Sequence, residues 1–252
     1  MSEDFFRALE SMDLQNSEIA YVYSDFRSVY SPQDYISKED FLRRILSILL
    51  DKVETVLIPT FTYTTAGLFN PVSTITTLGG LNAFIQRSVE SYTSDHPMFS
   101  FSGIGPKSRP LLENVGSEAF GHQSVFERLL DESCTFIHLG RPPYLGNTLV
   151  HRIEHQFQAP YREEIYFPTE VARGESILPG PYSAYLRRIG DVRANRYETV
   201  FLNAADFLIR KRAYKLVHYS SDYNSIWSGN FEDVHFRLAQ LFEEDRSIFI
   251  RQ

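Results

Sequence analysis

The segment GNTLVHRIEHQF, residues 146–157, places two histidines and a carboxylate within about one and a half turns of an expected helix. Residues three apart share a helix face, so the Glu154 carboxylate can accept a hydrogen bond from a ring nitrogen of His151. Such a carboxylate fixes the imidazole tautomer and leaves the other nitrogen as a general base. The spacing alone is equally compatible with an ordinary surface pair.

A zinc site is the alternative interpretation of the same segment, because it also contains the pattern H-x-x-E-H of some zinc peptidases. This interpretation uses His151 and His155 as ligands, Glu154 as the base, and Glu232 or Asp233 as a distant third ligand. However, Pro160 ends the helix soon after His155, whereas a zinc-binding helix is normally well supported along its length. We therefore expect no metal.

The composition of the 252-residue chain is that of an ordinary globular protein with an acidic surface. Hydrophobic residues make up 43% and charged residues 23%, which argues against disorder, and the formal net charge is −7. Nucleic-acid binders normally carry a basic surplus, so we expect no nucleic-acid partner. The single cysteine, Cys134, lies in an apolar run and is expected in the core.

The sequence gives no sign of a membrane or secreted location. No segment approaches the roughly 18–20 apolar residues that a membrane span needs. The N-terminal segment MSEDFFRALESMD has no basic start followed by an apolar run, so we expect no signal peptide. We therefore expect a cytoplasmic protein without a membrane partner.

Expected strands and helices alternate along the chain, which is typical of an α/β fold. The pattern predicts a strand at 18–26, a helix at 38–52 with Ser37 as its N-cap, and a strand at 53–61. It then predicts helices at 80–91 and 122–132, a strand at 134–140 and a short helix at 147–157. Further strands are expected at 163–171, 182–189 and 214–221, and a last helix at 230–243.

Polar residues follow three of the expected strands. They are the pair Ser24 and Asp25, the residues 60–62, and the residues 140–148. In α/β sheets, ligands bind where strands end and helices begin, so we expect these three ends to converge on one cleft. Residues 63–80 are rich in Thr, Gly and Asn and are expected to form a long loop, which in a compact domain is often functional.

The stretch TSDHPMFSFSGIGPKS is a weaker candidate for ligand binding. Ser100 and Ser102 alternate with phenylalanines, which predicts a short strand. Gly103 and Gly105 allow close backbone approach, and Pro106 suits the first turn of a helix whose amides could bind a phosphate or a carbonyl. The chain contains no P-loop, no dinucleotide-binding G-x-G-x-x-G and no G-x-S-x-G nucleophile elbow.

An ordered set of short motifs resembles the aminoglycoside 3-N-acetyltransferase family. The motifs are LIPTFTYT (57–64), FNP (69–71), GGLNAFIQRS (79–88), SDHPMFSFSGIGPKS (94–108), GHQSVFERLLD (121–131), FIHLG (136–140) and NTLVHRIEHQFQAPYR (147–162). The resemblance covers residues 18–170 and accounts for Asn147 and Thr148, which the zinc interpretation leaves unused. It implies one domain over residues 1–252, an α/β/α sandwich with a central mixed sheet and antiparallel additions. Residues 171–252 would then supply acceptor-side and closing elements.

The resemblance implies acyl transfer from acetyl-CoA, or another acyl-CoA, to an amine, without a metal. His151 would be the general base, supported by Glu154, and the thioester would lie near Thr148. The residues implied in cofactor binding are Ser24, Asp25, Phe26, Thr60, His96, Pro97, Ser100, Phe101 and Thr148. The family's first-strand motif V-H-S-S-L reads V-Y-S-D-F here, so Tyr23 and Asp25 replace its His and its second Ser. No activated Ser or Cys nucleophile is visible, which favours direct attack by the amine.

The acceptor is the least determined part of this interpretation. Tyr63, Glu163 and Glu164 are the expected acceptor-binding residues. A polycationic aminoglycoside would require several carboxylates, and the sequence offers few here. The SDHPMFSFSGIG variant also resembles members linked to surface-sugar synthesis. We therefore expect a nucleotide-linked amino sugar as acceptor, with an aminoglycoside as the alternative, and the sequence leaves a homo-oligomer open.

Overall fold

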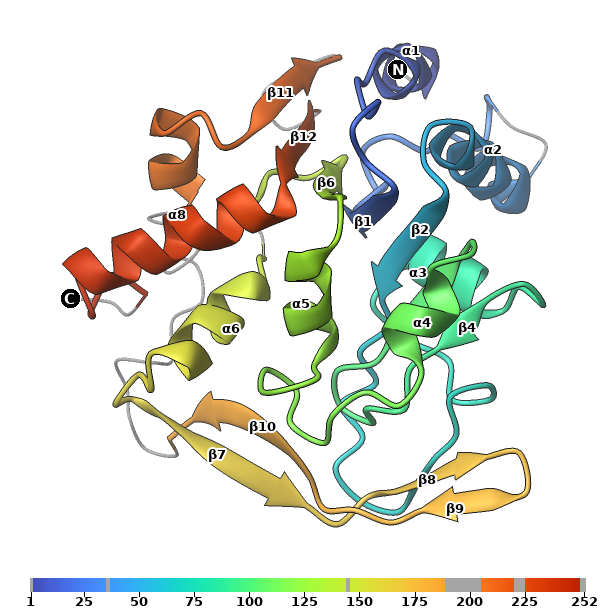
Figure 1. Ribbon diagram of the computed structural model, residues 1–252. Helices are drawn as coiled ribbons and strands as arrows, with labels where there is room; N and C mark the ends of the chain where they lie inside the picture. The colour runs from blue at the N-terminus through green and yellow to red at the C-terminus, as the bar shows by residue number, and fades with distance from the viewer. Residues whose placement is uncertain (1, 35–36, 144–145, 189–204, 220–224, 250–252) are drawn as a thin grey trace.

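The computed structural model describes residues 2–34, 37–143, 146–188, 205–219 and 225–249. Its main element is a seven-stranded mixed sheet (Figure 1). The strands follow the order β11 (Lys215–His218), β12 (Ser225–Asn230), β6 (Cys134–Leu139), β1 (Ile19–Ser24), β2 (Thr55–Pro59), β5 (Phe101–Ile104) and β4 (Tyr92–Thr93). The first, second and third predicted strands are the three strands at the centre of this sheet.

The three central strands are parallel, and the flanking strands are antiparallel. Ile19 of β1 pairs with Thr55 of β2 on one side and with Cys134 of β6 on the other. β12 and β5 run antiparallel to β6 and β2, respectively. β1 is buried over nearly its whole length, as expected of a parallel strand covered on both faces. The carboxyl ends of β1, β2 and β6 therefore meet at the same edge of the sheet.

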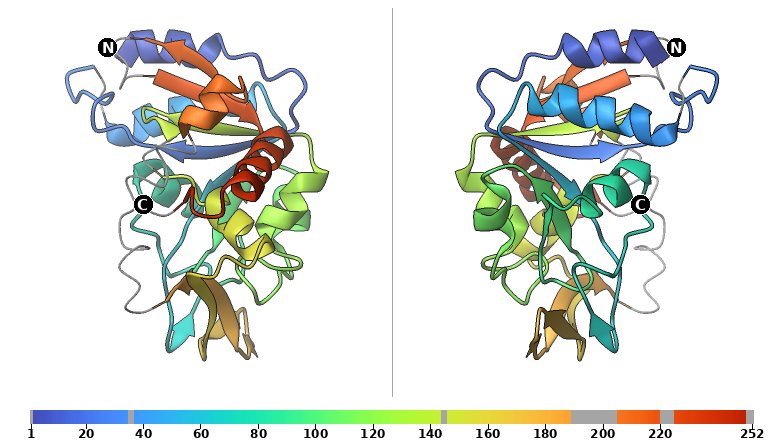
Figure 2. Two further views of the ribbon diagram at one scale, coloured as in Figure 1. Left: turned by 90° about the vertical axis from the view of Figure 1, so that its left-hand side faces the viewer. Right: turned by 90° about the vertical axis from the view of Figure 1, so that its right-hand side faces the viewer.

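Helices cover both faces of the sheet (Figure 2). One layer consists of α1 (Ser2–Glu10), α2 (Lys38–Leu50) and α3 (Gly80–Gln86). The other consists of α4 (Ser108–Leu112), α5 (Val125–Arg128) with the 3₁₀ turn η1 (Leu129–Asp131), α6 (Leu149–Gln156) and α8 (Phe231–Glu244). This arrangement confirms the predicted fold class, a mixed sheet between helical layers with antiparallel additions.

Helix starts follow the capping residues of the sequence. The Ser37 hydroxyl accepts from the Asp40 amide at 3.1 Å, so α2 begins where it was predicted. The Asn230 side chain accepts from the Asp233 amide at 2.9 Å and starts α8. The prediction of a helix over 80–91 was too long, because α3 ends at Gln86 and its C-cap is Arg87.

Two small sheets lie beyond the main sheet (Figure 1). β7 (Arg162–Phe167) pairs antiparallel with β10 (Tyr182–Arg187), and β8 (Glu170–Arg173) lies between β3 (Leu68–Phe69) and β9 (Ser176–Leu178). The single strand predicted over 163–171 is thus wrong in detail. It is divided after Phe167, because Pro168 has no amide hydrogen for the ladder.

The stretch expected to supply acceptor-side and closing elements also contributes to the main sheet. β11 and β12 come from this stretch, and β12 pairs directly with β6. The sheet therefore draws on both ends of the chain. Cys134 is buried as a free cysteine, as predicted. Among the described residues, no helix combines the length and apolarity that crossing a bilayer requires.

Candidate active site

The helix α6 brings His151 and Glu154 together. His151 Nδ1 lies 2.7 Å from Glu154 Oε2, the i, i+3 contact that the spacing predicted. The Glu154 side chain is only 1% exposed and that of His151 is 15% exposed, so this is a buried pair and not a surface pair. Arg162, which opens β7, places its Nε 2.6 Å from the same carboxylate oxygen.

Electrostatics assign the protons of this group. The hydrogen bond from His151 and the charge of Arg162 outweigh burial and hold the pKa of Glu154 below its usual value. An ionised carboxylate can only accept, so His151 Nδ1 must donate to it, and the basic lone pair of the neutral ring is on Nε2. Burial, followed by the charge of Arg162, lowers the pKa of His151 despite Glu154. The imidazole is therefore neutral at neutral pH.

His155 lies one turn further along α6 and has different neighbours. Its Nε2 is 3.8 Å from both Glu118 and Glu164, and its ring packs edge-on against Tyr185 with 5.4 Å between the ring centres. Among the described residues, no group of three or more His, Cys, Asp or Glu side chains is placed to hold a metal ion. The geometry thus favours the base interpretation over the zinc interpretation with Glu232 or Asp233.

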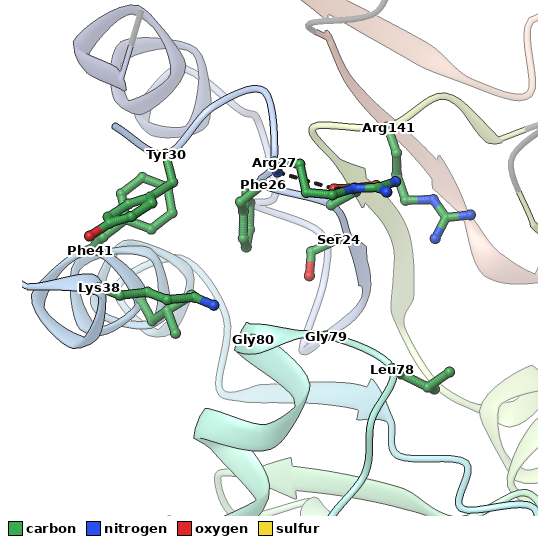
Figure 3. Close-up of a pocket in the computed structure, with 12 residues that line it drawn as sticks. Ser24, Phe26, Arg27, Tyr30, Lys38, Phe41, Leu78, Gly79, Gly80 and Arg141 are labelled. Atoms are coloured by element: carbon green, nitrogen blue, oxygen red, sulfur yellow. Dashed lines mark hydrogen bonds and ion pairs between the residues drawn. The ribbon is translucent and has the colours of Figure 1, made fainter. Parts of the chain in front are cut away.

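A cavity of about 590 Å³ opens at the carboxyl ends of the central strands (Figure 3). Ser24, Asp25 and Phe26 line it at the end of β1, Gly79 and Gly80 at the start of α3, and Arg141 after β6. Arg27 and Lys38 add two more cationic side chains. Arg27 donates to Asp25 at 2.5 Å and holds the pKa of that carboxyl below its usual value.

A smaller cavity of about 160 Å³ adjoins the first and shares Ser24, Leu78 and Arg141 with it. Its remaining lining residues are Tyr23, Pro59, Phe61, Tyr63, Asn82, Gly146 and Thr148. Thr148 is the N-cap residue of α6, and its carbonyl accepts from the His151 amide at 2.9 Å. The small cavity is therefore one helical turn from the His151–Glu154 pair. All three strand ends contribute to these cavities, but the second does so through Pro59 and Phe61 and not through Thr60 or Thr62.

Comparison with known proteins shows the family of the chain. The sequence model of the aminoglycoside 3-N-acetyltransferase family matches residues 45–218. The chain belongs to the aminoglycoside 3-N-acetyltransferase family. It is accordingly an acyl-CoA-dependent N-acyltransferase. No curated protein matches the chain.

Solved structures of the family share the fold at low sequence identity. AAC(3)-Xa has a TM-score of 0.78 and 14% identity, with 96% of this chain and 92% of that chain covered. AAC(3)-IVa as apoenzyme has a TM-score of 0.75 and 18% identity, with 100% and 91% covered. AAC-IIIb in a binary complex with CoASH has a TM-score of 0.75 and 16% identity, with 97% and 96% covered.

The residues that the family resemblance implied in cofactor binding occupy three different settings. Ser24, Asp25, Phe26 and Thr148 line the two cavities. Thr60, Ser100 and Phe101 are buried and line neither. The Ser100 hydroxyl donates to the Thr60 carbonyl at 2.8 Å, and Phe101 packs in the core against Phe61 with ring centres 5.4 Å apart. Their contact with a cofactor stays a prediction.

His96, which with Pro97 forms the family-like HP pair, is held by the protein itself. Its Nε2 donates to the Ser183 carbonyl at 3.1 Å, and its Nδ1 accepts from the amides of Met98 and Phe99 at 3.3 and 3.0 Å. Burial lowers the pKa of His96 to about 4. These contacts make His96 a rigid brace between the loop and β10. A cofactor contact of His96 and Pro97 stays a prediction.

Of the residues expected to bind the acceptor, Tyr63 lines the small cavity and is half-exposed. It adopts a left-handed backbone conformation, with φ at 52°, which a non-glycine residue rarely takes outside sites that constrain it. Glu163 and Glu164 lie on β7, where Glu164 approaches His155. Their role in acceptor binding is not settled by these positions and stays a prediction.

The sequence did not indicate three of the site's charged and polar groups. Arg162 was part of a recognised motif, but nothing in the spacing paired it with Glu154. Tyr23 and Arg141 flank the small cavity although neither was singled out. The one available signal was Tyr23 itself, which stands where the family's first-strand motif has histidine.

Proposed function

We propose that this enzyme transfers a short acyl group from acyl-CoA to the amine of an amino sugar, with His151 as general base. The observation that carries the proposal is the part-buried hydrogen bond of 2.7 Å between His151 Nδ1 and the buried Glu154. It leaves the basic lone pair on Nε2 and orients the ring, and these are the two requirements for a base at an active site. The ionised Glu154 also stabilises the imidazolium once the proton has been taken.

The reaction on this proposal is a direct attack. The amine nitrogen attacks the thioester carbon, and His151 Nε2 takes a proton from the amine nitrogen. The tetrahedral intermediate then collapses, the carbon–sulfur bond breaks, and the proton passes from His151 to the leaving thiolate. The products are an amide and free CoA thiol. Fixing both substrates beside the base supplies much of the rate, because it converts a bimolecular step into an effectively unimolecular one.

The charges at the large cavity support acyl-CoA as the donor. Arg27, Lys38 and Arg141 all line this cavity, and the CoA nucleotide carries several negative charges on its phosphates. Figure 3 places Lys38 and Arg27 on opposite sides of the strand end that carries Ser24. The pantetheine arm would then lead past Ser24, which lines both cavities, to the small cavity beside Thr148.

The size of the small cavity supports a short acyl group. Its volume of about 160 Å³ corresponds to the space of about five water molecules, taking ~30 Å³ for each. An acetyl or propionyl thioester fits such a volume, whereas a long acyl chain does not.

The acceptor side supports an amine of modest positive charge. Glu118 and Glu164 lie near His155, and burial raises the pKa of Glu164. AAC(3)-IVa has been seen in complex with a gentamicin, so one relative binds an amino sugar of the aminoglycoside class. The few carboxylates here favour an acceptor with a single amine. We take it to be a nucleotide-linked amino sugar of surface polysaccharide synthesis.

The test is the replacement His151→Asn, which keeps a side chain that can bond to Glu154 but removes the base. We expect thiol release from acetyl-CoA with an amino-sugar acceptor to fall about 10²- to 10⁴-fold. Binding of acetyl-CoA, followed by thermal shift, should not change. The matched control is His122→Asn, an exposed histidine that lies 3.0 Å from Glu127 and outside the His151–Glu154 pair. An unchanged rate in His151→Asn would remove His151 from the mechanism.

An acceptor panel separates the remaining alternatives. Thiol release with nucleotide-linked amino sugars, and none with aminoglycosides, supports the proposed acceptor. The reverse result makes the enzyme an aminoglycoside acetyltransferase by activity as well as by family. Stoichiometric zinc in the purified protein that is lost in His155→Ala would instead support the hydrolase interpretation.

A further inference from the structure

Tyr23 is a buried residue that lines the small cavity. Its side chain is 8% exposed and lies at the end of β1. The hydroxyl of Tyr21, which is fully buried, donates to the Tyr23 hydroxyl at 3.0 Å. Because the Tyr23 oxygen accepts this bond, its own proton must be directed to another acceptor. A hydroxyl that accepts one bond is also a stronger donor for the next.

The second polar group at the same place is Thr148. It lines the small cavity together with Tyr23, although the two residues come from β1 and from the start of α6. The side chain and main chain of Thr148 both donate toward the Tyr23 oxygen and oppose the rise that burial causes in the pKa of Tyr23. Although Thr148 holds the N-cap position, its side chain bonds to no amide of α6. Capping therefore does not explain this hydroxyl.

The residues that line the small cavity would favour a negative charge that develops inside it. The guanidinium of Arg141 lies 5.8 Å from the centre of the Tyr23 ring and lines the same cavity. Most of the other lining residues are apolar or aromatic, including Phe61 and Leu78. Donors in such a setting are worth more than in water, because little solvent screens them.

We propose that the hydroxyl of Tyr23, oriented by the bonds it accepts from Tyr21 and Thr148, holds the thioester carbonyl oxygen of the bound acyl-CoA and stabilises the oxyanion that forms on it. This inference rests on the proposed function, because it assumes that the acyl group occupies the small cavity. When the amine nitrogen bonds to the thioester carbon, the carbonyl electron pair moves to oxygen, where the Tyr23 hydroxyl donates to it. The pair returns to re-form the carbonyl as the carbon–sulfur bond breaks, so Tyr23 keeps its proton.

The packing of Tyr23 explains its ring but not its hydroxyl. The ring contacts Phe136 at 5.4 Å and His138 at 5.6 Å between ring centres. A phenylalanine would make these contacts equally well and would not leave a polar atom to be satisfied inside the sheet edge. Tyr23→Phe therefore separates the role of the hydroxyl from the role of the ring.

The experiment compares wild-type enzyme with Tyr23→Phe, Thr148→Val and the double variant. Loss of one oxyanion donor typically lowers kcat about 10²- to 10³-fold, and we expect at least the lower value for Tyr23→Phe. The KM for acetyl-CoA should stay within about twofold, because the donors act mainly in the transition state. The double variant should lose little more than Tyr23→Phe alone, since Thr148 acts on the oxyanion through Tyr23.

A spectroscopic readout tests the contact directly. Infrared difference spectra of acetyl-CoA labelled with ¹³C at the carbonyl should show a band shifted to lower frequency when bound to the wild type. The shift should shrink in Tyr23→Phe, because a hydrogen bond to the carbonyl oxygen is lost. A merely structural role of Tyr23 would leave the shift in place. Tyr219→Phe, which alters a tyrosine packed against Phe5 on the other side of the sheet, is the matched control.

The outcomes separate this inference from the proposed function. If Tyr23→Phe and Thr148→Val keep the wild-type kcat and band position while His151→Asn is inactive, the inference is overturned and the proposed function stands. If neither His151→Asn nor Tyr23→Phe changes the rate, both are wrong. If Tyr23→Phe lowers both kcat and thermal stability, the frequency of the carbonyl band of bound acetyl-CoA decides. The same frequency in variant and wild type overturns the inference.

Discussion

Two buried histidines in this enzyme, His96 and His151, are held by different kinds of partner. His96 donates to a backbone carbonyl and accepts from two backbone amides, so all its partners are neutral. His151 donates to the carboxylate of Glu154. The two rings are 3% and 15% exposed, respectively, so burial does not distinguish them strongly. The partner does.

The comparison shows what separates a histidine that braces a loop from one that can take a proton. A carbonyl and two amides favour one neutral tautomer and cannot compensate a charged ring, so the pKa of His96 falls to about 4. For His151, burial and Arg162 lower the pKa, but the bond and charge of Glu154 oppose them. A charged partner therefore stabilises the imidazolium of His151, and none of the partners of His96 does so.

The largest expected effect comes from Glu154→Gln, which makes the partner of His151 neutral like those of His96. We expect kcat to fall about 10²-fold or more, because the amide no longer stabilises the imidazolium and can fix the wrong tautomer. Glu154 raises the pKa of His151, so its loss should move the acid limb of kcat/KM to lower pH. The measurement is thiol release from acetyl-CoA across a pH series.

Glu127→Gln is the control for that variant, since Glu127 pairs with Arg152 and His122 and does not contact His151. The acid limb of kcat/KM in this variant should lie at the same pH as in the wild type. If Glu154→Gln kept the wild-type kcat, the carboxylate would have no part in activating His151, and the contrast with His96 would have no functional meaning.

The next effect concerns stability and not activity. Because the pKa of His96 is about 4 in the folded enzyme and about 6.5 when unfolded, the unfolded state binds more protons between these values. The free energy of unfolding should therefore fall as the pH drops from about 6.5 toward 4, by about 3 kcal/mol for this residue. His96→Asn, whose side-chain oxygen can accept from the same amides, should lose this share of the pH dependence.

Denaturant unfolding of wild type and His96→Asn at several pH values measures the difference. His235, whose pKa burial also lowers to about 4, and the carboxylates contribute equally to both proteins and cancel. Parallel stability curves for the two proteins would show that His96 is not held neutral by its surroundings.

The sequence revealed one side of this comparison better than the other. The His151–Glu154 contact lies within one helix, so the helical period and the helix end expected before Pro160 were enough to predict it. The three parallel strands and the N-cap of α2 were likewise predicted from local sequence patterns. The contacts of His96 depend on Ser183 in β10, and the partner of Glu154 is Arg162 in β7. Neither β7 nor β10 could be placed from its own residues.

Elements with weak local signals were missed for the same reason. β12 contains Ser225, Gly229 and Asn230, which are poor strand formers, and it is a strand because it pairs with β6. The amphipathic α1 was not predicted as a helix, although its buried face packs on the layer of α2. The small cavity likewise arises from segments far apart in sequence, so Tyr23 and Arg141 could not be assigned to it in advance.

The smallest expected effect sharpens the contrast from the other direction. Arg162 lowers the pKa of His151, so Arg162→Gln should raise that pKa and move the acid limb of kcat/KM to higher pH. This shift is opposite in sign to that of Glu154→Gln, although both variants break the same 2.6 Å ion pair. Arg152→Gln, which alters an arginine of α6 that pairs with Glu127, should leave the limb in place. If Arg162→Gln and Glu154→Gln moved the limb in the same direction, general disruption of the buried pair would explain both. The pKa of His151 would then not be set by these two charges acting against each other.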